Sequence, residues 1–232
     1  MTAAETQSQI PQQLPLSLAL PRRRARGRAG FIVSAANDDA LKLIDGWRNW
    51  PEGRLAIFGP EGSGKTHLAH VWMQDAGAEK VAAVTLSAED APALISAGAV
   101  VVEDGDRIEG RAQEHALFHL LNLARAEGCA VLLTGRTAPV RWRVATPDLA
   151  SRLTATPAVA LEPPDEALMR DLLIKHFSDR HLKVGEDVIA FLVPRLPRAA
   201  AAAGAITAQL DDAALTQSRK ITVPFVKEVL DV

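Results

Sequence analysis

The chain has 232 residues, 48% of them hydrophobic and 23% charged, which is enough for one or two globular units with apolar cores of their own. Its single cysteine, Cys129, excludes an intramolecular disulfide, and its place in the apolar run 129–133 is typical of a buried thiol in a reducing compartment. No apolar stretch approaches the roughly 18 to 20 residues that span a bilayer and no signal peptide is evident, so we expect a cytoplasmic protein without membrane contact.

Residues 1–30 are expected to form a flexible tail, because they are first polar, then rich in proline and finally basic. Five arginines between Arg22 and Arg28 oppose one acidic residue, Glu5, so the tail carries a charge of about +4 and the remaining chain about −6. Such a cluster can contact DNA, but an arginine run in a flexible tail is more often a solvated linker. We expect any DNA contact to be indirect or weak.

Short apolar runs alternate with helical patterns in the part of the chain that follows. Five runs are expected to be buried strands: residues 55–58, 81–86, 100–102, 130–134 and 159–161. Helices are expected between them, at 66–74 and along the apolar stripe 116–124. The alternation predicts an α/β fold, in which a parallel five-stranded sheet is flanked by helices.

After residue 162 the strand signals stop. Helices are expected at residues 165–178, 186–195, 198–217 and 223–231, the last of them capped by Thr222. We place a boundary at Pro163, between an α/β domain of residues 31–162 and a small C-terminal α-helical domain of residues 163–232.

A phosphate-binding loop follows the first expected strand, and it is defined here as residues 59–66. These residues match the pattern G-x-x-x-x-G-K-[ST]: Gly59, Pro60, Glu61, Gly62, Ser63, Gly64, Lys65 and Thr66. The backbone N–H groups of such a loop curl around an anion at a helix N-terminus. Lys65 is expected to reach the outer phosphates of ATP or ADP, Thr66 to hold Mg²⁺, and the adjacent His67 to belong to the same site. The alternative is a glycine-rich turn that binds no nucleotide.

The third expected strand ends in the carboxylates Glu103 and Asp104, with Asp106 two residues further on. Carboxylates at such a strand end can hold the water shell of Mg²⁺, a role expected of Glu103, and can orient an attacking water. An exposed acidic turn is the alternative. Aspartate commonly precedes glutamate at this place, and the inverted order here predicts weak intrinsic hydrolysis.

Three stretches resemble the DnaA-like AAA+ family, and they are most similar to its shorter regulators, the Hda branch. Residues 147–153 resemble the arginine-finger segment, 161–164 the entry to the helical lid, and 219–230 the C-terminal end of the regulators. The similarity extends over residues 31–232 and implies a P-loop AAA+ fold with a helical lid. It also implies a protein that binds adenine nucleotide, with ADP favoured. While bound to the DNA polymerase sliding clamp, such a protein stimulates ATP hydrolysis by the initiator DnaA. This hydrolysis suppresses repeated initiation.

The resemblance assigns roles to individual residues. Arg152 would be a finger that reaches in trans to the γ-phosphate of a neighbour's ATP, a task suited to a planar guanidinium; the alternative is a surface arginine near a helix end. Thr134 would sense the γ-phosphate. A hinge segment would place Phe31, Ile32 and Val33 along the adenine, although these residues could equally belong to the domain core.

The sequence departs from the family pattern at two positions. Arg136 stands where the related regulators have an acidic residue, and Ala201 stands where the lid usually presents a sensor arginine. Arg198 lies nearly one turn before Ala201 and is the candidate to replace that arginine. These departures, together with the inverted acidic pair, lead us to expect little or no intrinsic ATPase activity.

A peptide in the tail resembles the clamp-binding segment of the regulators. Its contacts are expected from Gln13, Leu14, Leu16 and Leu18. An extended segment stiffened by Pro15 can place leucines in an apolar pocket at limited ordering cost, whereas the alternative is packing against the protein's own domain. The expected partners are therefore DnaA and the sliding clamp, with a homodimer as a further possibility.

Two other functions are compatible with these motifs. One is a self-sufficient AAA+ ATPase such as a helicase loader, which the phosphate loop and acidic strand end would permit. The other is a DNA-binding module acting through the arginine tail. The sequence ends at Val232, directly after the expected lid, so we expect no C-terminal helix-turn-helix DNA reader.

Overall fold

A computed structural model describes residues 31–231. A single parallel sheet is built in the order β2-β3-β4-β1-β5. Its strands are β1 (Arg54–Phe58), β2 (Glu79–Ala82), β3 (Ala99–Glu103), β4 (Ala130–Gly135) and β5 (Ala158–Ala160). Parallel neighbours need crossover connections, and helices supply them along the chain. The predicted five-stranded parallel sheet is confirmed.

The second strand lies earlier than expected. Residues 81–86 were expected to be extended, but β2 ends at Ala82 and a 3-10 turn follows at Ala83–Thr85. Ala83 and Leu86 are both buried even though neither lies in a strand. Burial of an apolar run can thus be achieved by a turn as well as by a strand, which is why hydrophobicity alone misplaced this element.

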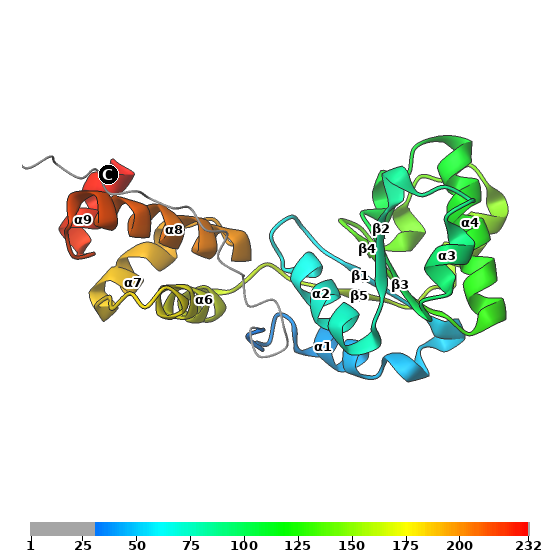
Figure 1. Cartoon of the computed structure of the whole chain (residues 1–232), viewed down its shortest axis with the longest axis horizontal. Helices are drawn as coiled ribbons and strands as arrows, with labels where there is room; N and C mark the ends of the chain where they lie inside the picture. Colours follow the sequence, from blue (N-terminus) through cyan, green and yellow to red (C-terminus); the bar gives the residue numbers. More distant parts are fainter. Residues whose placement is uncertain (1–30, 232) are drawn as a thin grey trace, which may run out of the picture.

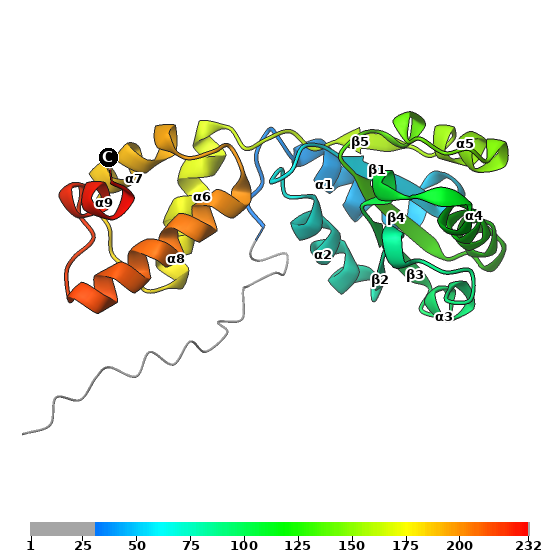
Figure 2. The same ribbon diagram turned by 90° about the horizontal axis from the view of Figure 1, so that it is seen from above.

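Helices cover both faces of the sheet (Figures 1 and 2). The helices of this part are α1 (Asp38–Asp45), α2 (Lys65–Ala76), α3 (Ala91–Ile95), α4 (Gly110–Glu127) and α5 (Pro147–Thr154). Leu55 and Ile57 of β1 pack with α1 and α2, whereas Ala56 between them packs with α3, α4 and α5, as the alternation of side chains along a strand requires. The apolar stripe expected on α4 is buried along its length.

The C-terminal helices pack around a third apolar cluster, at the end of the molecule away from α4 and α5 (Figure 2). They are α6 (Glu166–Asp179), α7 (Glu186–Leu192), α8 (Ala200–Gln217) and α9 (Val223–Leu230). Asp165 caps α6, since its Oδ1 accepts a hydrogen bond of 2.7 Å from the Leu168 N–H. Thr222 is the N-cap residue of α9, as expected, but within the described residues its side chain makes no capping hydrogen bond.

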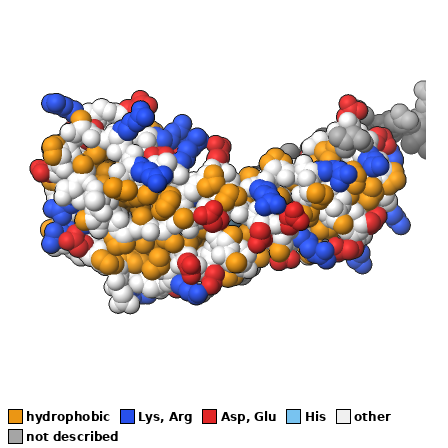
Figure 3. Space-filling model, turned by 180° about the vertical axis from the view of Figure 1, so that it is seen from behind, with side chains coloured by type: hydrophobic (Ala, Val, Ile, Leu, Met, Phe, Trp, Pro, Cys, Tyr) orange, Lys and Arg blue, Asp and Glu red, His pale blue; other side chains and the backbone are white. Residues whose placement is uncertain are grey.

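Short 3-10 turns complete the described chain at Trp47–Asn49, Pro51–Gly53, Ala83–Thr85, Gly105–Arg107, Pro139–Arg141 and Val193–Arg195. Cys129 is buried, as expected. Across residues 31–231 no helix combines the length and the apolar character needed to cross a bilayer. On the face shown in Figure 3, basic and acidic side chains are interspersed, with apolar patches between them.

Candidate functional site

The candidate site lies at the carboxyl ends of the three central strands. The phosphate loop follows β1, the acidic residues end β3, and Thr134 lies near the end of β4. Because β4 pairs with both β1 and β3, these segments meet at one edge of the sheet. The Gly59 N–H donates to the Gly135 carbonyl oxygen at 3.2 Å, which joins the phosphate loop to the end of β4.

Two glycines give the phosphate loop a shape that other residues adopt with strain. Gly62 has a φ of 80°, and Gly64, which precedes α2, has a φ of 102°. The loop is curled around its own lysine, because the Lys65 ammonium donates to the carbonyl oxygens of Gly59 at 2.7 Å and Pro60 at 2.8 Å. Ser63 is buried, and its hydroxyl has no hydrogen-bond partner within the described residues.

Lys65 lies in an environment that lacks sufficient negative charge. Burial lowers the pKa of this lysine; Asp104 and Asp106 counteract this most strongly among the nearby charges, and Arg136 adds to the lowering. The net pKa of Lys65 stays below its ordinary value of 10.5. A bound phosphate would supply the missing anionic partner.

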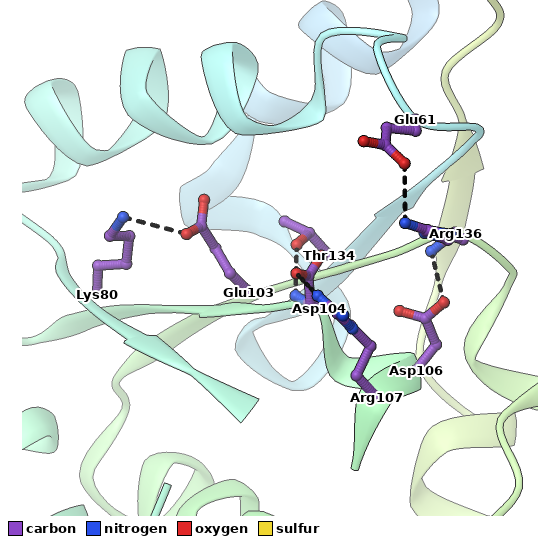
Figure 4. Close-up of polar contacts among 8 residues, drawn as sticks. All are labelled: Glu61, Lys80, Glu103, Asp104, Asp106, Arg107, Thr134 and Arg136. Atoms are coloured by element: carbon purple, nitrogen blue, oxygen red, sulfur yellow. Dashed lines mark hydrogen bonds and ion pairs between the residues drawn. The ribbon is translucent and has the colours of Figure 1, made fainter. Parts of the chain in front are cut away.

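The acidic residues at the end of β3 point in different directions (Figure 4). Glu103 pairs with Lys80 of β2 at 3.1 Å. The Asp104 N–H donates to the Thr134 hydroxyl at 3.1 Å, and the Asp104 carboxylate lies 3.4 Å from Arg107. Of the two predicted carboxylates, Asp104 is therefore the one that acts on Lys65, while Glu103 is turned toward the neighbouring strand.

These groups fit a magnesium nucleotide. Oε1 of Glu103 and Oδ1 of Asp106 are buried without hydrogen-bond partners among residues 31–231, as is the Ser63 hydroxyl. Carboxylate and hydroxyl oxygens are the ligands that Mg²⁺ prefers, and the exposed Thr66 lies in the first turn of α2 beside them. The half-buried Lys65 and the backbone of the loop provide the complementary phosphate contacts.

The segment expected to line the adenine packs against both the α/β part and the C-terminal helices. Phe31 lies edge-on to His67, with 5.3 Å between the ring centroids. Ile32 packs against the apolar cluster of the C-terminal helices, whereas Val33 is 54% exposed. The carbonyl oxygen of Ile32 accepts a hydrogen bond of 2.9 Å from the side chain of the buried Asn37, which holds the segment in place.

Helix α8 touches the phosphate loop directly. The Ala200 N–H, at the first residue of the helix, donates to the Gly62 carbonyl oxygen at 2.8 Å. Arg198, the candidate sensor, forms an ion pair of 3.2 Å with Glu166 at the start of α6, and Ala201 is exposed one residue beyond the contact. From the C-terminal helices, the structure thus brings the first small residue of α8 to the loop, whereas Arg198 is paired with Glu166.

Arg152 lies on α5, on the far side of the sheet from α2 and from the C-terminal helices (Figure 2). Its guanidinium carbon is 6.0 Å from the centroid of the Phe118 ring. Glu114 of α4 anchors the entry to α5: its carboxylate accepts from the N–H groups of Ala145 and Thr146, each at 2.8 Å, and from the Thr146 hydroxyl at 2.6 Å. The finger candidate therefore does not face its own phosphate loop.

Asp106, the last carboxylate of the predicted acidic strand end, accepts a hydrogen bond of 2.9 Å from the Arg136 N–H. Trp142 was not identified from the sequence. It packs against Gly105 and Gly135, and its indole N–H donates to the Thr137 carbonyl oxygen at 2.8 Å. The predicted clamp-binding residues lie outside the described part of the chain: Gln13, Leu14, Leu16 and Leu18.

Comparison with known families identifies the C-terminal helices. Residues 165–230 match the family model described as "Hda, lid domain". This stretch contains all four C-terminal helices, from α6 to α9.

Solved structures with the same fold include domain III of the replication initiation protein DnaA from Thermotoga maritima. Its TM-score is 0.69 at 18% sequence identity, and the match covers 87% of this chain and 93% of that one. AMPPCP-bound DnaA from Aquifex aeolicus gives a TM-score of 0.60 at 17% identity, covering 73% of this chain and 60% of that one. The RuvB Holliday junction branch migration motor from Thermotoga maritima gives 0.69 at 16% identity, covering 90% and 72%. At these identities the matches establish the P-loop AAA+ fold.

Proposed function

We propose that this chain, a DnaA-like AAA+ protein whose lid belongs to the Hda family, is a negative regulator of the initiation of DNA replication. In this proposal it binds adenine nucleotide, docks on the DNA polymerase sliding clamp, and stimulates ATP hydrolysis by the initiator DnaA. The match of residues 165–230 to the Hda lid is the observation that carries the proposal, because the phosphate loop by itself occurs in many ATPases.

The nucleotide has a structural role in this proposal. Lys65 and the loop amides hold its phosphates, while Thr66 and, through water, Glu103 hold Mg²⁺, and the ion neutralises phosphate charge when bound. The contact between Gly62 and Ala200 supports this role, since a ligand in the loop would also set the position of the lid. Glu103 is paired with Lys80, which supports weak intrinsic hydrolysis.

Arg152 acts on the partner in this proposal. Its place on α5, away from its own phosphate loop, supports action in trans (Figure 2). A guanidinium that reaches the γ-phosphate of initiator-bound ATP neutralises the charge that spreads over the phosphate oxygens during hydrolysis. Glu114 positions the helix that carries this residue through its three bonds to residues 145 and 146.

The tail supplies the second partner. The segment that contains Gln13, Leu16 and Leu18 would enter an apolar pocket of the clamp. Pro15 stiffens this segment, so less conformational entropy would be lost on binding. Binding to a clamp loaded on DNA would raise the effective concentration of the regulator near initiator bound to the same DNA.

The test is a reconstitution of ATP-bound DnaA, sliding clamp loaded on DNA, and this protein, with the rate of ATP hydrolysis as the readout. We expect Arg152→Ala to lower the stimulated rate by about 100-fold or more, in line with fingers supplied in trans. Arg143→Ala removes an exposed arginine from the segment before α5 and serves as the matched control. Undiminished stimulation by Arg152→Ala would exclude the finger.

The clamp is tested separately, by pull-down of the clamp with the full chain. Gln13→Ala and Leu16→Ala should each abolish capture, while leaving the melting temperature unchanged. Retention of the clamp by both variants would contradict the docking role of the tail. Vigorous hydrolysis by this chain alone, independent of the clamp and lost in Lys65→Ala, would instead indicate a self-sufficient ATPase.

A further inference from the structure

Arg136 sits beside the phosphate loop because of the pairing of two strands. It directly follows Gly135, the last residue of β4, and Gly135 pairs with Phe58 at the end of β1. Its backbone is fixed on the other side, since the Arg136 N–H donates to Asp106 Oδ2 at 2.9 Å. The two contacts hold the Cα of Arg136 at the mouth of the candidate nucleotide site.

The guanidinium of Arg136 reaches across that mouth to the phosphate loop (Figure 4). Its Nη2 lies 2.9 Å from Oε2 of Glu61, the third residue of the loop. Both charges act on Lys65: Arg136 lowers the pKa of the lysine and Glu61 raises it. The site therefore holds a second cation close to the phosphate-binding lysine, with a carboxylate of the loop as its partner.

We propose that Arg136 is a cis phosphate-binding residue that exchanges its ion pair with Glu61 for the outer phosphates of the bound nucleotide. The inference rests on the proposed nucleotide binding and adds a specific regulation to it. Glu61 acts as a competitor for the arginine, so nucleotide entry must displace a carboxylate of the loop itself.

The energetics favour this exchange. The side chains of Arg136 and Glu61 are 56% and 83% exposed, and an ion pair between such exposed groups is weak. A polyphosphate presents several negative charges and more acceptor oxygens than one carboxylate, and a planar guanidinium can bind two of them at once. Asp106 keeps the backbone in place during the exchange, so only the side chain has to move.

The test measures the dissociation constants of MgADP and Mg-AMPPCP for the full chain by calorimetry. We expect Arg136→Gln to weaken binding by about tenfold, the scale of a charge-assisted hydrogen bond. Arg141→Gln is the matched control, since Arg141 is exposed on the turn that follows β4 and the same charge is removed. Its affinity should stay within about twofold of the unaltered protein.

Variants of Glu61 separate the exchange from a general effect of charge. Glu61→Asp keeps the negative charge but shortens the side chain, so it should release Arg136 and tighten binding by about threefold. The gain should disappear when Glu61→Asp is combined with Arg136→Gln, because no arginine remains to be released. Equal gains in both backgrounds, or none in either, would overturn the exchange.

The outcomes distinguish this inference from the function on which it rests. If the unaltered protein binds nucleotide, Lys65→Ala does not, and Arg136→Gln binds as well as the unaltered protein, the role of Arg136 is overturned and the nucleotide site stands. If the unaltered protein binds neither ligand, both proposals fail. Should Arg136→Gln lower stability in a thermal melt, Arg136→Met replaces it in the same double-variant comparison, and equal gains from Glu61→Asp with and without the arginine still overturn the exchange.

Discussion

The N–H of Ala200 donates a hydrogen bond of 2.8 Å to the carbonyl oxygen of Gly62, and this bond joins the first residue of a lid helix to the middle of the phosphate loop. The approach is close: a Cβ atom added to Gly62 would lie 2.4 Å from the Cβ of Ala199. Small residues on the lid and a glycine in the loop are thus both needed for the contact. A change in the conformation of the phosphate loop can therefore act on the C-terminal helices directly, through this hydrogen bond.

Gly62→Ala is therefore expected to separate the lid from the loop. Small-angle scattering should show a larger radius of gyration, and the free energy of unfolding should fall. Gly98→Ala is the matched control, since Gly98 has a φ of 78° against 80° for Gly62 but no neighbouring atom within 4 Å of an added Cβ. The control should lose only the backbone cost of about 1 to 2 kcal/mol and keep its radius of gyration. Identical scattering changes in the two variants would contradict the role of the lid contact.

Glu114→Gln is expected to destabilise the entry to α5. The carboxylate accepts three hydrogen bonds there, and an amide presents its NH₂ group to donors, so we expect a loss of about 2 to 3 kcal/mol in urea unfolding. Glu127→Gln on the exposed end of the same helix should change stability by less than about 0.5 kcal/mol. Equal losses in the two variants would show that Glu114 does not anchor α5.

The same carboxylate predicts a pH dependence of stability. Burial alone would raise the pKa of Glu114, but hydrogen bonds from the Thr146 hydroxyl and from the N–H groups of Ala145 and Thr146 outweigh it and hold the pKa below its ordinary value of 4.5. Its contribution is thus complete above pH 4.5 and is lost as the pH falls through the lowered pKa. The stability difference between the unaltered protein and Glu114→Gln should shrink below pH 4.5; a constant difference down to pH 3 would refute the assignment.

Trp142 should report nucleotide binding by fluorescence. It is buried against Gly105 and Gly135, beside the acidic residues and Arg136, whereas Trp47 and the two other tryptophans lie in the cluster with α1 and α2. We expect MgADP to change the emission, and Trp142→Phe to abolish that change. Trp47→Phe is the control and should keep it. A full response in Trp142→Phe would place the reporting tryptophan elsewhere.

Cys129 is expected to be unreactive in the folded protein. Burial raises the pKa of its thiol to about 11, so at pH 8 the thiolate is a minor species with little access to reagents. Labelling with a disulfide reagent should be slow in buffer and complete within seconds in denaturant, which makes the single thiol a probe of opening. Rapid stoichiometric labelling of the folded chain would contradict its burial.

Much of the fold could be predicted because its signals are local. The strand before the phosphate loop, the stripe on α4 and the four C-terminal helices all follow from short-range periodicity, and the structure confirms them. One strand prediction failed, because residues 83–85 form a turn although Ala83 is still buried. Thr222 is the N-cap residue of α9, as predicted, but its side chain makes no capping bond within the described residues.

The phosphate loop was recognisable because its residues are consecutive, and the sequence determined by itself that the chain carries a P-loop with a helix behind it. The tertiary structure alone decided which groups meet there: Glu61 with Arg136, Gly62 with Ala200, and Asp104 with Thr134. Each pair comes from segments that are far apart in the chain. Strand order and helix packing bring these residues together. Their separation along the sequence does not predict such contacts, because the contacts depend on how the strands and helices are arranged in space.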